Sequence, residues 1–157
     1  MKKLYGLQMT QKLSDFLKSF EQRQYAAQKG TDMHLKMQHI VIDDKNGNIG
    51  DENIINIIKS KPELLSFFSS AAQTEVPISG FINDIFVSRR IDRLLINHET
   101  KVIDFIDYKT DTDKSAFVEQ YKCQLKGYAE LLHSAYPNYK INGYVLWLHD
   151  WTLDKII

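Results

Sequence analysis

The sequence predicts an α/β or α+β domain with its sheet in the C-terminal half. Apolar residues at helical spacing dominate residues 1–72, whereas short runs of β-branched and aromatic residues dominate residues 73–157. One long helical pattern, at residues 115–135, separates the last predicted strand from the three before it. Helices, three strands, a helix and a strand are typical of a sheet packed against helices. We therefore expect a helical N-terminal segment and a sheet-containing core that belong to the same domain.

The N-terminal segment is expected to contain four helices. Residues 10–28 carry one apolar stripe, Gly30 interrupts it, and Thr31 is a suitable N-cap for a second helix. Pro62 favours the first turn of a later helix because proline needs no amide donor there. A loop and two short helices are expected to follow the second helix, at residues 43–50, 51–60 and 62–71.

The C-terminal segment is expected to form the sheet. Pro77 places the first strand near an edge, since proline cannot donate to a central ladder. Residues 81–87 fit either a strand or a loop, and Pro137 ends the long helix. Strands are predicted at residues 74–78, 91–96, 101–109 and 141–148.

Charge and cysteine content limit the function. The chain has 157 residues, with 20 basic and 20 acidic side chains, so it lacks the overall basic excess typical of nucleic-acid binding. One cysteine, Cys123, excludes an internal disulfide and a four-cysteine zinc or iron–sulfur site, and we expect a packed thiol. No apolar run reaches the ~18 residues of a membrane span, and polar residues follow the first six. A cytoplasmic location without a membrane partner is expected.

The strand ending at Lys109 carries the strongest chemical signal. Because side chains alternate along a strand, Asp107 and Lys109 share one face. A carboxylate and an ammonium two residues apart can hold a metal ion and a water together. A surface ion pair is the simpler interpretation.

The preceding strand supports the metal interpretation. If residues 98–101 form a four-residue turn, Asn97 faces Val102, and Asp92 lies opposite Asp107. Facing carboxylates repel unless a cation separates them, and Mg²⁺ prefers oxygen ligands. Another register would leave two solvated aspartates. Arg93 points to the face opposite Asp92.

The long helix adds a polar residue to its apolar stripe. Gln124 lies one turn before Tyr128 on the stripe expected to face the core. A glutamine there requires hydrogen-bond partners. It is either satisfied at the edge of the core or, beside an acidic metal site, a substrate contact. Asp111 is expected in a solvated loop.

Five short motifs follow one another along the chain. They are Gly30-Thr31-x-x-His34, Glu75-Val76-Pro77, Ile91-Asp92-Arg93-Leu94, Ile106-Asp107-Tyr108-Lys109-Thr110 and Gln124-Leu125-x-x-Tyr128-Ala129. In this order they resemble the motifs of the RecB-family nucleases of the PD-(D/E)XK superfamily. The resemblance is strongest to the C-terminal nuclease domain of AddA-type helicase–nucleases, and it runs from Gly30 to Trp147. The resemblance implies a restriction-endonuclease-like core, a mixed four-stranded sheet flanked by helices in the order αβββαβ.

The resemblance also implies roles for individual residues. The implied ligands of Mg²⁺, for which Mn²⁺ can substitute, are His34, Asp92, Asp107 and the carbonyl of Tyr108. The other implied active-site residues are Lys109 as the catalytic lysine, Gln124 and Tyr128 on the long helix, and Glu75 near the first strand. The implied reaction is hydrolysis of DNA phosphodiester bonds, by an exonuclease domain that acts in double-strand-break repair and recombination.

The sequence departs from the family at one position and lacks one part. Arg89 stands where the family usually has glycine, and Arg89, Arg90 and Arg93 form either a phosphate-contacting cluster or a solvated strand edge. This sequence contains no helicase motor, so its expected partners are DNA and a helicase motor or an AddB-like subunit. Weak DNA binding by the chain alone is expected from its neutral charge. The alternatives are an inactive nuclease-like DNA-binding module and a stand-alone restriction- or phage-type nuclease.

Overall fold

The computed structural model describes residues 30–157 of the chain. The chain divides into two compact units, Met1–Leu35 and Lys36–Ile157. The helix predicted at residues 10–28 lies outside the described residues. Residues 30–38 are helical, so the second predicted helix is present, and Thr31, which was expected to be its N-cap, lies within it.

The second unit contains a mixed sheet of five strands in sequence order, so the predicted α+β class is confirmed and the predicted number of four strands is wrong. Only β3 and β4 pair in parallel, and helix α4 (Lys114–Ala135) connects them; the other neighbours are antiparallel. The strands are β1 (Gln73–Ile82), β2 (Ile85–Asn97), β3 (Val102–Lys109), β4 (Lys140–Trp147) and β5 (Thr152–Lys155). The missed strand, β5, has four residues at the edge of the sheet, too few to give an alternating pattern.

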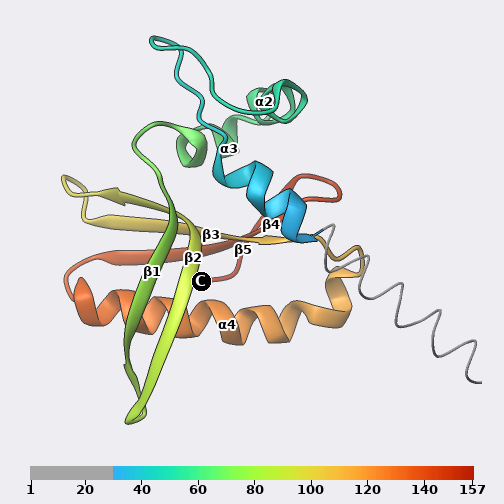
Figure 1. The fold of residues 1–157 in the computed structure, drawn as a ribbon. Helices are drawn as coiled ribbons and strands as arrows, with labels where there is room; N and C mark the ends of the chain where they lie inside the picture. The colour runs from blue at the N-terminus through green and yellow to red at the C-terminus, as the bar shows by residue number, and fades with distance from the viewer. Residues whose placement is uncertain (1–29) are drawn as a thin grey trace, which may run out of the picture. The chain divides into compact units, whose positions relative to one another are not determined.

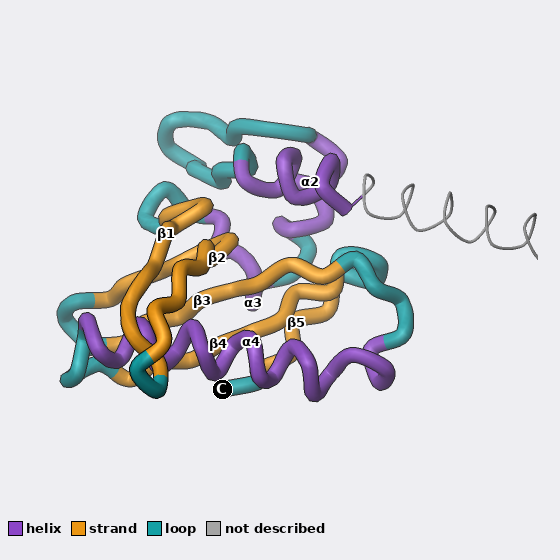
Figure 2. The backbone as a smooth tube through the Cα atoms, turned by 60° about the horizontal axis from the view of Figure 1, so that its bottom comes forward, coloured by secondary structure: helices purple, strands orange, loops and turns teal. Residues whose placement is uncertain are grey.

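Helices lie on both sides of the sheet (Figures 1 and 2). The long helix α4 runs along one side, and three short helical segments lie on the other. Asp51 caps the first of these through its side chain, and Pro62 is the first residue of the second, as predicted. The segments are α2 (Glu52–Lys59), α3 (Pro62–Leu65) and η1 (Ser66–Phe68). Among the described residues, none of the helices has the length and apolar character needed to cross a bilayer.

The core between α4 and the sheet fixes the position of the long helix. Leu125 and Tyr128 of α4 are buried against Phe105 of β3 and Trp147 of β4. Gly143 makes room for this packing, because a Cβ there would lie 2.5 Å from Cζ of Phe105. The packed apolar face of α4 therefore determines where Gln124, the residue directly before Leu125, points.

The β1–β2 hairpin crosses α4 and extends beyond the rest of the sheet (Figure 1). Its turn residues, Asn83 and Asp84, have φ of 49° and 62°, as the type I′ turn of a two-residue hairpin requires. The segment 81–87 is therefore strand, turn and strand. Strand β2 pairs with β3 only from Arg93 onward, so its first half has β1 as its only strand partner.

Candidate active site

The two predicted aspartates meet where β2 and β3 separate. Asn97 pairs with Val102, as predicted, and Arg93 pairs with Ile106. One residue beyond this last pair, Asp92 Oδ2 accepts a hydrogen bond of 2.6 Å from the backbone N–H of Tyr108. The Asp92 carboxylate thus takes the place that a backbone carbonyl of β2 would have in the hydrogen-bond ladder with β3. This places Asp92 directly beside Tyr108, the residue that follows Asp107.

A local bend in β1 and β2 accounts for this separation. Ile91 and Leu94 of β2 are three residues apart and both lie in the same core cluster, so the usual alternation of side chains is interrupted between them. Opposite Asp92, Glu75 of β1 has φ of 54°, in the left-handed region that is rare for residues other than glycine. Such backbone outliers are concentrated at functional sites. The bend turns both Ile91 and Leu94 into the core beneath α4.

Asp107 lies at the centre of a buried polar cluster. Its Oδ2 is 2.5 Å from Lys109 Nζ and accepts no hydrogen bond from the described residues. Its Oδ1 accepts a hydrogen bond of 3.0 Å from Gln124 Nε2, and the hydroxyl of Tyr128 lies 3.4 Å away. The predicted pairing of Asp107 with Lys109 on one face is confirmed, and Gln124 and Tyr128 reach the same carboxylate.

Lys109 is held on three sides. Besides Asp107, its ammonium donates a hydrogen bond of 3.1 Å to Gln124 Oε1, and it lies 4.3 Å from the ring centroid of Tyr121. The Tyr121 hydroxyl in turn donates to Asp111, which is therefore not simply a solvated loop residue. Sequence reasoning missed Tyr121, although it precedes Gln124 by three residues and so lies on the same face of α4.

Burial and mutual repulsion make the two carboxylates unfavourable as a pair of anions. Burial, followed by the charge of Asp107, raises the pKa of Asp92 to about 7, although the Tyr108 N–H opposes the shift. Two weaker contributions oppose each other: the charge of Glu75 raises the pKa of Asp92, and the charge of Lys109 lowers it. Burial and the charge of Asp107 also raise the pKa of Tyr128 to about 12. A cation beside Asp92 and Asp107 would relieve this repulsion.

The donor set fits a hard divalent cation. Asp92 and Asp107 supply carboxylate oxygens, and Asp107 Oδ2 has only an ammonium as its partner among the described residues. The N–H of Tyr108 points toward Asp92, while Lys109 O accepts from Leu148 on the other side of β3. Because the N–H and C=O of one residue point the same way in a strand, the Tyr108 carbonyl faces Asp92 too. This orientation agrees with its implied role as a ligand.

Two of the implied site residues keep roles that stay predictions. His34 belongs to the unit Met1–Leu35, whereas both aspartates belong to the unit Lys36–Ile157. Glu75 affects the pKa of Asp92 by its charge, but its carboxylate pairs with Arg90 Nη1 at 3.0 Å. Within residues 30–157, no three histidine, cysteine, aspartate or glutamate side chains form a group able to hold a metal ion.

The predicted arginine cluster does not exist as one surface. Arg93 is fully buried on the opposite side of the sheet from Asp107, where its guanidinium donates to three backbone carbonyls and to the Tyr108 hydroxyl. Arg89 and Arg90 are exposed. Cys123 is also exposed, contrary to the packed thiol expected, and it lines an open hollow between α4 and the β1–β2 hairpin.

Comparison of the chain with protein-family models and with curated proteins found no match.

Proposed function

We propose that this chain is a metal-dependent deoxyribonuclease with a restriction-endonuclease-like PD-(D/E)XK core of the RecB type. The observation that carries the proposal is the convergence of Asp92, Asp107, Lys109 and Gln124 from two strands and a helix. Asp92, the Asp107–Lys109 pair and Gln124 are far apart in the sequence, and a plain surface ion pair would not require a half-buried glutamine that bridges both of its members. The mixed sheet with a long helix between β3 and β4 is compatible with that core.

Asp92, Asp107 and the Tyr108 carbonyl would hold the cation, with His34 as the further ligand that the resemblance implies. When bound, a divalent cation there polarises a phosphate and lowers the pKa of a coordinated water. Asp92 must lose its proton to act as a ligand, because its pKa is raised to about 7. Cation binding is therefore expected to release protons at neutral pH.

Lys109, Gln124 and Tyr128 would act on the substrate side of the aspartates. The Lys109 ammonium orients the attacking water and offsets the negative charge that develops on the phosphorane. Gln124 holds both Asp107 and Lys109 through its two amide atoms, so it fixes their separation. Tyr128 accepts a hydrogen bond of 2.7 Å from Gln124 Nε2 and keeps the amide in this orientation.

The test is incubation of the full chain with linear and circular DNA, each single- and double-stranded, in Mg²⁺ or in EDTA. Cleavage is expected in Mg²⁺ and not in EDTA, and cleavage confined to linear DNA would indicate an exonuclease. Asp107→Asn is expected to remove it. Asp104→Asn is the matched control, because Asp104 lies on the other face of β3 with Asn142 and Tyr144. DNA binding without cleavage by a folded chain would favour the inactive binding module instead.

A further inference from the structure

A groove lies between strand β2 and the middle of helix α4, where the β1–β2 hairpin crosses the helix (Figure 1). Arg89 of β2 faces α4, because its cross-strand partner Ile78 packs on the core beneath that helix and paired residues share one face of the sheet. Gly127 of α4 lies under the hairpin, and a Cβ there would touch Cδ1 of Ile82 at 3.8 Å. We call this hollow of about 240 Å³ the hairpin–helix groove, and it is lined by Ile85, Val87 and Arg89 of β2 and by Cys123, Gln124 and Gly127 of α4.

The hairpin–helix groove is continuous with the candidate active site through Gln124. This residue lines the groove, and its amide binds Asp107 at 3.0 Å and Lys109 at 3.1 Å. Arg89 precedes Asp92 by three residues of β2, which is roughly 10 Å along a strand. A polymer with one phosphate at the two aspartates would therefore reach Arg89 with a nearby phosphate.

Of the three arginines of β2, only Arg89 is both exposed and without an anionic partner among the described residues. Its guanidinium donates a hydrogen bond of 2.9 Å to the carbonyl of Ser88, which leaves its other donors available. Arg90 pairs with Glu75, and Arg93 is fully buried among backbone carbonyls. Because the planar fork of a guanidinium matches the oxygens of a phosphate, Arg89 offers the groove a site for an anion.

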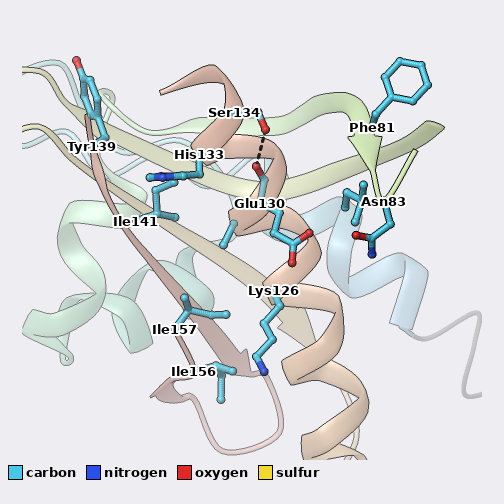
Figure 3. Close-up of a pocket in the computed structure, with 12 residues that line it drawn as sticks. Phe81, Asn83, Lys126, Glu130, His133, Ser134, Tyr139, Ile141, Ile156 and Ile157 are labelled. Atoms are coloured by element: carbon cyan, nitrogen blue, oxygen red, sulfur yellow. Dashed lines mark hydrogen bonds between the residues drawn. The ribbon is translucent and has the colours of Figure 1, made fainter. Parts of the chain in front are cut away.

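A larger hollow beside the hairpin turn lacks these features. It measures about 740 Å³, and Figure 3 shows that Lys126 and Glu130 of α4 both reach it, so charges of both signs line it. The described residues that line it include no aspartate, and neither Lys109 nor Gln124 is among them. Charge and position therefore favour the hairpin–helix groove as the path of a substrate.

We propose that Arg89 binds a backbone phosphate of the DNA strand in the hairpin–helix groove, beside the phosphate that is cut. This proposal rests on the proposed nuclease function for the identity of the polymer. Arg89 holds the strand toward Asp92 and Asp107 and takes no part in breaking the bond. The glycine that is usual at this position in the nucleases that the chain resembles would leave the groove without this cation.

The first test measures binding of a fluorescein-labelled single-stranded oligonucleotide to the full chain, at low salt and in EDTA so that nothing is cut. Arg89→Gln is expected to weaken binding about five-fold and to lower the slope of log affinity against log salt by about 0.7, as the loss of one phosphate contact requires. Arg89→Lys should keep the salt dependence, because it keeps the charge. Arg90→Gln, next to Arg89 but on the other face of the hairpin, and Lys45→Gln, in an exposed loop, are the matched controls and should bind nearly as the parent does.

A second readout uses Cys123, which is the one cysteine of the chain, is exposed and lines the groove. DNA in the groove should slow alkylation of this thiol by N-ethylmaleimide, a reagent without charge, as followed by mass spectrometry in EDTA. Protection is expected for the parent and for Arg90→Gln at an oligonucleotide concentration near the Kd of the parent. It should be largely lost in Arg89→Gln at the same concentration.

Equal affinity, salt dependence and protection for the parent and Arg89→Gln would overturn the proposal, as would a parent whose Cys123 is not protected by DNA. A loss of affinity in Arg90→Gln as large as that in Arg89→Gln would also contradict it, since net charge rather than the groove would then explain the binding. Arg89-dependent binding and protection without cleavage in Mg²⁺ would contradict the nuclease function and leave the groove as a DNA site. Cleavage by a chain whose binding does not depend on Arg89 would do the reverse.

Discussion

The two sides of the β2–β3 pair carry two buried polar clusters of opposite character. On one side, Arg93 is fully buried and directs its donors to Tyr108 and to the carbonyls of Met37, Ile40 and Phe67 at 2.6–3.0 Å. On the other side, the neighbouring residues Asp92 and Asp107 share a cluster in which two anions repel and one carboxylate oxygen accepts no hydrogen bond from the described residues.

The difference separates a structural cluster from a functional one. A buried charge whose three nitrogens all donate hydrogen bonds holds segments together, and Arg93 also stacks 4.0 Å above the ring of Phe68. A buried pair of like charges lowers the stability of the fold, and such pairs are concentrated at functional sites, where a bound ligand offsets the repulsion. We therefore expect substitutions in the Arg93 cluster to damage the fold and substitutions in the aspartate cluster to damage activity.

The largest expected effect on stability is that of Arg93→Met. The substitution leaves three carbonyls and the Tyr108 hydroxyl without their buried donor, which should cost about 3–5 kcal/mol of unfolding free energy. Urea denaturation followed by circular dichroism measures the loss. Arg90→Met is the control, since its exposed pair with Glu75 should contribute less than about 1 kcal/mol. Equal losses for the two variants would contradict the structural role of Arg93.

The opposite result is expected for Asp107→Asn. This variant should lose cleavage activity yet keep its fold, and without metal its melting temperature should equal or exceed that of the parent, because the repulsion with Asp92 is gone. Mg²⁺ should raise the melting temperature of the parent and not that of the variant. An unfolded Asp107→Asn would mean that this carboxylate is structural.

A pH dependence follows from the raised pKa of Asp92. Because this pKa is about 7 in the folded chain and 3.8 ordinarily, the folded state binds more protons between these values. The contribution of Asp92 to stability is therefore present at low pH and is lost as the pH rises through 7. Urea denaturation without metal at pH 5 and pH 8 measures this loss, and Asp92→Asn should reduce it. A parent and variant with the same pH profile would contradict the repulsion.

The smallest expected effect is that of Tyr121. Tyr121→Phe keeps the ring near Lys109 and should cleave nearly as the parent does, whereas Tyr121→Leu removes a cation–π contact of about 0.5–2 kcal/mol. A few-fold fall in kcat with little change in KM is expected for the leucine variant only. The same loss in both variants would assign the effect to the hydroxyl bond with Asp111 instead.

Local patterns predicted the aspartate cluster better than the arginine cluster. The alternation of side chains along the strands and the four-residue turn at residues 98–101 were sufficient to place Asp92 near Asp107. The turn that joins two strands determines their register. The stripe on α4 likewise predicted that Gln124 would face the core. The burial of Arg93 depends on carbonyls from Met37, Ile40 and Phe67, which are distant in the sequence. No local pattern contains that information.

The limits of the fold prediction have similar causes. The strands around residues 74–78 and 91–96 were predicted too short, since the hairpin that extends them is only half-buried on its covered face, where Gly80 interrupts the apolar alternation. The turn at Asn83 and Asp84 lacks glycine, which made residues 81–87 ambiguous. The contact of Tyr121 with Lys109 depends on how α4 is rotated against β3, and packing rather than spacing determines that rotation.

Calorimetric titration of Mn²⁺ into the full chain without DNA tests the central claim, that Asp92 and Asp107 form a cation site. The parent should bind with saturable heat and release protons at pH 7, because Asp92 must ionise. Asp107→Asn should lose this binding, and Asp104→Asn, on the opposite face of the same strand, should keep it. Equal binding by Asp107→Asn and the parent, or no binding by a folded parent, would contradict the account.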